Sequence, residues 1–245
     1  MSAEQMTRGV WVRKSIAILL AIWLLLSMIY FAAYMLAVEF EWQFLYYYVW
    51  LVAFGLPLWF FRRRVKAVLQ NWQAPGWVKF FLLAYGMVML EEVLAALFTH
   101  LDEGFNLWLY LRRITQFWAF NILAFTGLIF ATWLLFTRVQ YTFGEMFCLT
   151  GLAGLYSERV VFSLPTQPQV FIVFAPIVLF TYGLILSPAL MSGNTSRRRA
   201  LPFLLRCAAM VMAWYVFSQP PVWLLGILRV NYPFLFPPCG FIPCG

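Results

Sequence analysis

Two adjacent acids, Glu91 and Glu92, lie inside a long apolar stretch of the sequence. An ionised side chain at the centre of a membrane-spanning helix costs roughly 2.5–3.5 kcal/mol even on the lowest scales. The acids therefore need a counter-ion, a proton or a function. Neighbouring residues on a helix point about 100° apart, so the two carboxyls face different directions. Glu92 shares its face with Ala96 and with His100, the single histidine of the chain.

Three interpretations of the acid pair are open. In the first, the acids form structural ion pairs with arginines from neighbouring helix ends, because buried charges need partners. In the second, they form a proton or ion path, or a binding site for a polar headgroup. In the third, one Glu is a general base towards water and His100 is a second base, which makes Glu91, Glu92 and His100 candidate catalytic residues. The expected polar network at the outer helix ends comprises Asp102, Arg112, Arg113, Glu158 and Arg159.

The five residues 90–94, with the sequence LEEVL, resemble the start of the paired-glutamate motif of the CAAX-processing and bacteriocin-processing intramembrane proteases. In that family an arginine follows the pair where this chain has Ala96. The family also uses histidines on later helices, and none follows His100 here. The resemblance ends at the glutamate pair, and we assign no family from it.

The elements that carry these residues are predicted to be membrane helices. Apolar residues make up 64% of the 245 residues and charged residues only 11%, against about 45–50% and about 25% in soluble proteins. This composition excludes a soluble domain, a disordered chain, a coiled coil and a disulfide-rich secreted domain. We predict an all-α, polytopic integral membrane helical bundle.

About seven segments are long enough to cross the roughly 30 Å of hydrocarbon in a bilayer. If the fifth segment only dips into the membrane, the number of spans becomes six. Six prolines after residue 218 predict an extended segment, residues 219–245, on the outer face of the bundle formed by residues 1–218. The predicted spans are 16–38, 44–61, 77–99, 115–136, 141–161, 170–190 and 201–218.

The orientation follows from the basic residues, which concentrate on the cytoplasmic side of membrane proteins. With the N-terminus inside, every Lys and Arg except Arg112, Arg113, Arg159 and Arg229 lies on the inner side or at an inner helix end. We therefore predict a multi-pass protein with a cytoplasmic N-terminus and an outer C-terminus. The net charge of +8 then indicates contact with anionic lipids of the inner leaflet and no nucleic-acid partner.

Two local patterns add detail. Apolar residues at helical spacing beside Arg63, Arg64 and Lys66 predict a short helix in the membrane interface, either a lipid-lying connector or a regulatory docking helix. In the fifth segment, small residues and Glu158 share one side of a helix, a pattern that lets another helix approach closely. We expect this stripe to pack on the third span.

The cysteines and the histidine do not predict a metal site. Cys239 and Cys244 are close enough in sequence to form a short disulfide in an oxidising compartment, with lipid attachment or a metal as alternatives. One histidine among carboxylates offers fewer nitrogen and sulfur ligands than zinc usually takes. The sequence assigns no cofactor.

The function favoured by the sequence is a binding or accessory role within the membrane. The loops are short, and neither a phosphate-binding glycine loop nor an HExxH or GxSxG sequence occurs. The chain is thus expected to be a subunit of a membrane complex or a binder of lipid-like molecules, with lipids and other membrane subunits as partners. The main alternative is a lipid-facing hydrolytic enzyme built on Glu91, Glu92 and His100. A proton-coupled carrier ranks third.

Overall fold

The computed structural model describes residues 3–193 and 199–236, with the backbone alone for residues 3–13. Within these residues the chain is helical and forms no β-strand. The prediction of an all-α helical membrane bundle is confirmed at this level, because six helices are long and apolar enough to cross a membrane. These candidate spans are Lys14–Ala37, Trp42–Phe60, Gly76–Asp102, Leu107–Arg138, Pro168–Ser192 and Phe203–Asn231.

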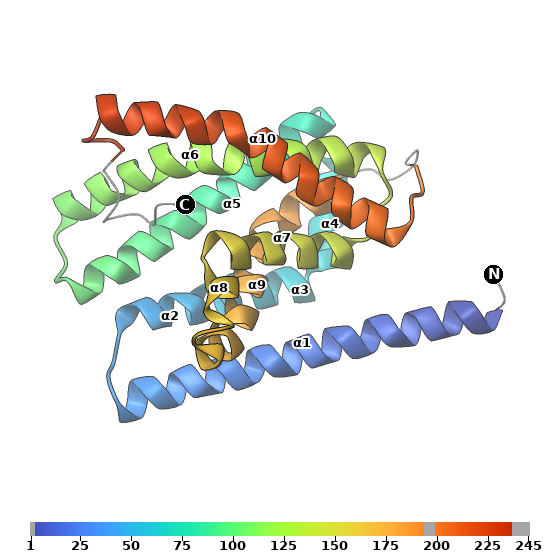
Figure 1. The fold of residues 1–245 in the computed structure, drawn as a ribbon, viewed down its shortest axis with the longest axis horizontal. Coiled ribbons are helices and arrows are strands. Elements are labelled where there is room, and N and C mark those ends of the chain that lie inside the picture. The colour runs from blue at the N-terminus through green and yellow to red at the C-terminus, as the bar shows by residue number, and fades with distance from the viewer. Residues whose placement is uncertain (1–2, 194–198, 237–245) are drawn as a thin grey trace.

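The helices follow one another with short connections (Figure 1). The second candidate span is continuous but changes geometry: α2 passes into a π-helical segment, η1, which ends two residues before Pro57. Pro57 lacks the backbone N–H that would donate to the carbonyl four residues earlier, and prolines therefore distort helices locally. The elements are α1 (Ala3–Ala37), α2 (Trp42–Tyr48), η1 (Val49–Gly55), α3 (Leu56–Phe60), α4 (Arg62–Asn71), α5 (Gly76–Asp102), α6 (Leu107–Arg138), α7 (Phe143–Ser157), α8 (Val160–Ser163), α9 (Pro168–Ser192) and α10 (Phe203–Asn231).

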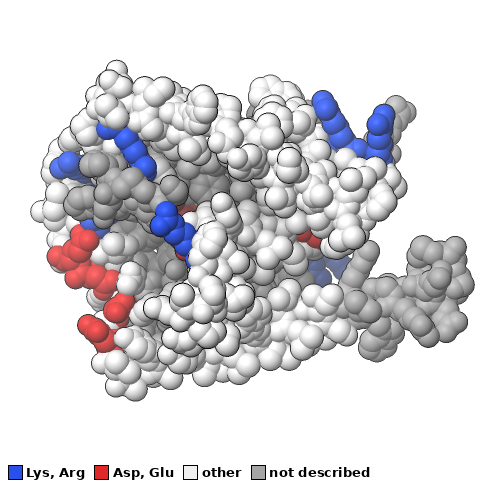
Figure 2. Space-filling view, in the orientation of Figure 1, with Lys and Arg blue, Asp and Glu red and all other residues white. Residues whose placement is uncertain are grey.

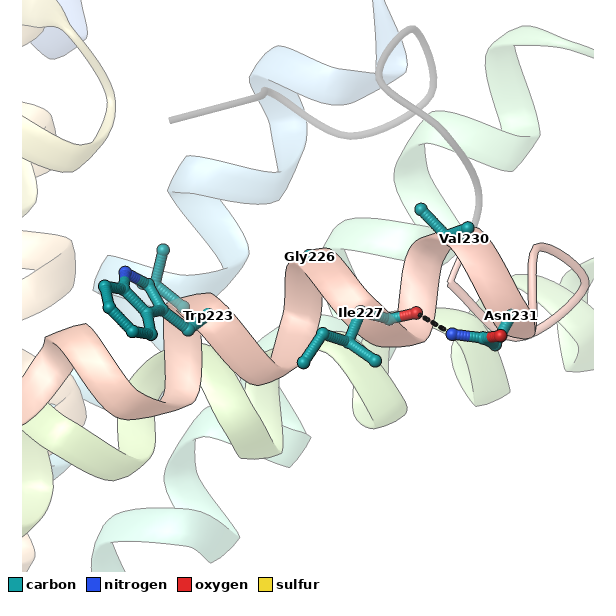
Figure 3. Close-up of a pocket in the computed structure, with 6 residues that line it drawn as sticks. Trp223, Gly226, Ile227, Val230 and Asn231 are labelled. Atoms are coloured by element: carbon teal, nitrogen blue, oxygen red, sulfur yellow. Dashed lines mark hydrogen bonds between the residues drawn. The ribbon is translucent and has the colours of Figure 1, made fainter.

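Helix α9 is the centre of the bundle. Nearly every residue from Ala175 to Ser192 is buried, and the helix contacts α1, α4, α5, α7, α8 and η1. Helices α5 and α6 form a hairpin, and α10 packs along α6 (Figure 1). The outer surfaces are apolar: on α10, Trp223, Ile227 and Val230 project around Gly226 and line a shallow open groove (Figure 3). Such an exterior matches a lipid environment.

Helix α10 corrects one prediction. The expected end of the last span near residue 218 is wrong, because the helix continues through Pro220 and Pro221 to Asn231. In membrane helices, carbonyls that a proline leaves without a donor find other neighbours. Here the Phe217 carbonyl, four residues before Pro221, lies against α6: a Cβ atom added to Gly127 would be 2.4 Å from its oxygen. The predicted Cys239–Cys244 pair lies outside the described residues.

The segment between α6 and α10 leaves and re-enters the bundle at one end. The Arg199 amide donates to the Arg138 carbonyl at 2.9 Å, so the two ends of this segment lie side by side. Helix α7 has 15 residues, fewer than the roughly 20 that a full crossing needs. The N-terminal part of α9 lies beside the middle of the α1 span, since Trp23 Nε1 donates to the Ile172 carbonyl at 2.7 Å.

The two ends of the bundle differ in charge (Figure 2). At the end where α1 and α5 terminate, acidic side chains gather beside arginines of the α5–α6 hairpin; we call this the acidic end. The opposite end, called the basic end, carries the arginines and lysine of α4 together with Arg138 and Arg199. The acids of the acidic end are Glu39, Glu41, Asp102 and Glu103.

Candidate functional site

Glu91 and Glu92 lie near the middle of α5, and Glu91 is about 17 Å along the helix from its end at Asp102. Each carboxyl accepts a hydrogen bond from a different helix. The Tyr46 hydroxyl of α2 donates to Glu91 Oε1, and Asn121 Nδ2 of α6 donates to Glu92 Oε1. Both donors are buried, whereas the two acids are only half-buried. The acids thus lie near the middle of a candidate span and keep part of their surface exposed.

A third acid joins them from the other half of the bundle. Glu158 ends α7 as its C-cap residue and is exposed. The Tyr182 hydroxyl of α9 donates to Glu158 Oε1. Glu158 lies close enough to interact electrostatically with both acids of α5 and with the Tyr47 side chain. The members of this carboxylate cluster are Glu91, Glu92, Glu158, Tyr46, Tyr47, Asn121 and Tyr182.

Two backbone features of the α7–α8 segment position Glu158. Gly154, one helical turn earlier, leaves space for the Tyr182 ring: an added Cβ would be 2.3 Å from the Cγ atom of that ring. The ring can therefore lie on α7 and reach Glu158 with its hydroxyl. The next residue, Arg159, has φ of 58°, in the left-handed region that non-glycine residues rarely adopt. This conformation ends α7 and turns the chain into α8.

The stripe of small residues packs elsewhere than expected. Gly151 and Gly154 face Leu179 and Tyr182 of α9, so the prediction that the stripe packs on the third span is wrong. The small residues do allow another helix to approach α7 closely, as predicted, but that helix is α9. This is the central helix of the bundle, and it lies between α7 and much of α5.

Two arginines form ion pairs with acids other than those of α5. Arg113 pairs with Glu103 at 2.8 Å, and Arg206 pairs with Glu145 at 2.6 Å. The Arg112 guanidinium lies over the Phe234 ring at 4.6 Å. Arg112 and Arg113, expected as possible partners of the acid pair, thus stabilise the acidic end instead. Neutral donors, a phenol and an amide, hold the α5 carboxyls.

The remaining predicted site residues have contacts of their own at the acidic end. His100 is buried, and its Nε2 accepts a hydrogen bond from the Asn106 amide at 2.9 Å. Asp102 accepts hydrogen bonds from the Trp42 and Gln43 amides at 2.8 and 3.1 Å, which caps α2 from the end of α5. His100 and Glu92 are about 12 Å apart along the helix and share none of these partners.

Comparison with protein families, characterised proteins and solved structures finds no match. The site is therefore interpreted from its own chemistry. In the described part of the chain, no group of three or more His, Cys, Asp or Glu side chains is arranged to hold a metal ion. Three acids with neutral donors around them can hold protons, or can accept hydrogen bonds and positive charge from a ligand.

Four members of the cluster do not follow from sequence reasoning. Tyr46 and Tyr47 belong to a run of aromatic residues that is typical of membrane interfaces, yet the structure directs Tyr46 into the bundle. Asn121 is a polar residue in the middle of a long apolar span, and this position is the one feature of the sequence that could have indicated its role. No sequence feature indicates a role for Tyr182, since single tyrosines in apolar helices are common.

Proposed function

We propose that this chain is a membrane-embedded binding protein whose carboxylate cluster takes the cationic or hydrogen-bond-donating group of a lipid-like molecule. The observation that carries the proposal is a pair of adjacent acids near the middle of a candidate span, each held by a neutral hydrogen-bond donor from another helix. Ionised acids in such a place need compensating charge. Because Glu158 is exposed and the α5 acids are half-buried, a ligand can reach them.

The contacts of His100 favour binding over hydrolysis. A Glu and a His that activate water together must both lie within hydrogen-bond reach of that water. The Nε2 atom of His100 is engaged by the Asn106 amide, and its ring packs against Phe105 and Tyr110. Its Nδ1 atom lies 3.9 Å from Glu103 Oε2 at the acidic end, away from Glu91 and Glu92. The carboxylate cluster lies deeper and includes no histidine. A ligand that is bound without reaction needs only the groups that the cluster contains.

A charged-amine probe tests the proposal. Dodecylamine and dodecanol have the same chain length and differ in headgroup charge, so we expect the purified protein in detergent to retain the amine preferentially in native mass spectrometry. Glu91→Gln keeps an acceptor for Tyr46 but removes the charge. We expect it to lower amine affinity about tenfold, equivalent to about 1.4 kcal/mol.

Glu39→Gln is the matched control, because it removes an exposed acid at the acidic end outside the cluster, and it should bind the amine as wild type does. Equal retention of amine and alcohol by the wild type, or unchanged amine binding by a folded Glu91→Gln protein, contradicts the proposal. A similar loss in Glu39→Gln would show that overall charge alone governs retention.

We also propose that the basic end faces the cytoplasm, which places the N-terminal end of α1 inside and Asn231 outside. The positive-inside rule supports this orientation. Residues 138 and 199 meet at one end, so in the proposed topology the segment from α7 to α9 enters and leaves the membrane on the same side as a hairpin. The remaining long helices make five crossings: α1, α2–α3, α5, α6 and α10. An odd number of crossings places the ends of the described chain on opposite sides.

Cysteine labelling tests this orientation. In intact cells a membrane-impermeant maleimide should react with Glu39→Cys, at the acidic end, and with Gln73→Cys only after lysis. The unsubstituted chain gives the background from its own cysteines. Labelling of Gln73→Cys in intact cells would reverse the orientation.

A further inference from the structure

Helix α4 carries an unusual concentration of exposed positive charge at the basic end. Its exposed side chains include Arg62, Arg63, Arg64 and Lys66. No acidic residue occurs in the sequence between Glu41 and Glu91. We name these four basic residues the α4 patch. Its charge is therefore not balanced by its own segment of the chain.

The acid of α7 at the basic end also does not neutralise the patch. Glu145, which belongs to the capping box that starts α7, forms an ion pair with Arg206 at 2.6 Å. Of the acids whose side chains the structure describes, the others lie in the carboxylate cluster or at the acidic end. The α4 patch is thus a net positive surface.

Aromatic side chains set the height of the patch relative to the membrane. The Arg62 guanidinium lies over the Trp59 ring at 4.4 Å and donates to the Trp59 carbonyl at 2.8 Å. The Arg64 guanidinium lies over the Phe61 ring at 5.9 Å. Both rings are exposed. Tryptophan concentrates at the headgroup level of the bilayer, so Arg62, beside Trp59, is expected to lie where lipid phosphates are.

The helix is held in a fixed position under the patch. Val65 and Leu69, one turn apart, are its half-buried residues, and α4 packs on α9. At the C-terminal turn, the buried Lys79 ammonium of α5 donates to the Leu69 carbonyl at 3.0 Å. Packing on α9 and the Lys79 contact therefore hold α4 against the bundle, which presents the patch in one orientation.

We propose that the α4 patch is a docking surface for the headgroups of anionic phospholipids in the leaflet at the basic end. The geometry is suited to phosphate, because an arginine guanidinium donates two parallel hydrogen bonds to it. The surface is separate from the carboxylate cluster and has the opposite charge. Its occupant is the membrane lipid itself, selected by charge.

Lipid retention during purification tests the proposal. We expect the wild type in native mass spectrometry to retain phosphatidylglycerol at least tenfold better than phosphatidylcholine with the same acyl chains. Substituting all four patch residues by Gln should remove this preference. Arg63→Gln/Lys66→Gln is the second variant, because these two exposed side chains leave the contacts with Trp59 and Phe61 intact, and it should reduce the preference severalfold.

Two controls separate the explanations. Arg112→Gln, at the acidic end, should leave the preference unchanged. Addition of inorganic phosphate at millimolar concentration should not displace the lipid. Equal retention of both lipids by the wild type, an unchanged preference in the folded double variant, displacement by free phosphate, or an equal loss in Arg112→Gln would each overturn the proposal.

Discussion

Replacing Gly127 by alanine is expected to destabilise the protein by about 1–3 kcal/mol, the range typical of overpacked cores. The added Cβ would lie 2.4 Å from the Phe217 carbonyl oxygen and 2.5 Å from the Ser218 Cα atom. Both are backbone atoms of α10, so no side chain can rotate out of the way. The helices must separate, and the Phe217 carbonyl would lose the close neighbour that it has beside Pro221. Thermal unfolding in detergent measures the effect.

Gly226→Ala and Gly86→Ala are the matched controls. Both glycines lie inside helices, and an added Cβ at either meets nothing within 4 Å. Alanine has the higher helix propensity by about 1 kcal/mol, so these variants should be as stable as the wild type or more so. A Gly127→Ala protein as stable as its controls would show that α6 and α10 do not meet in this way.

Replacing Gly154 by alanine is expected to weaken ligand binding as well as to lower stability. The new Cβ would overlap the Tyr182 ring, at 2.3 Å from its Cγ atom. The ring must move, which withdraws its hydroxyl from Glu158. We expect a loss of about tenfold in dodecylamine affinity and a lower unfolding temperature.

Two variants separate packing from hydrogen bonding at this position. Tyr182→Phe keeps the ring on Gly154 and removes the hydroxyl, so affinity should change while stability changes less. Gly144→Ala adds a methyl group on the same helix where it meets nothing within 4 Å, and both properties should be preserved. Undiminished affinity in a folded Gly154→Ala protein would remove Tyr182 from the site.

The positions of the long helices could be predicted because apolar runs are properties of the local sequence. The span predicted at 77–99 is α5, and that at 170–190 is α9, each within a few residues. Helix ends were less predictable. Helix α6 begins at Leu107 because the Asn106 side chain accepts a hydrogen bond from the Leu109 amide at 3.1 Å, which places Arg112 and Arg113 inside the helix. The local sequence also contains the capping box of Thr142 and Glu145 that starts the short α7.

The candidate site was predictable only in part for the same reason. The depth of Glu91 and Glu92 follows from counting residues along one helix. Their neighbours come from other helices: Tyr46 lies 45 residues before Glu91, and Asn121 lies 29 residues after Glu92. Helical periodicity specifies which residues share a face but not which helix covers that face. The role of α9 as the central helix decides this, and it is a property of the assembled bundle.

The break between α7 and α9 has a consequence for water. Residues 164–167 form no regular helix and are exposed, yet the N-terminal part of α9 lies beside the middle of α1. Irregular backbone at membrane depth is tolerated only inside protein or along a wet cavity, because hydrocarbon cannot solvate its amides and carbonyls. The amides of Leu164, Thr166 and Gln167 donate to carbonyls of Val161 and Ser163, so the exposed carbonyls of the break are the groups that need water from one face of the protein. We expect the bilayer to thin beside this break, so that water reaches its carbonyls.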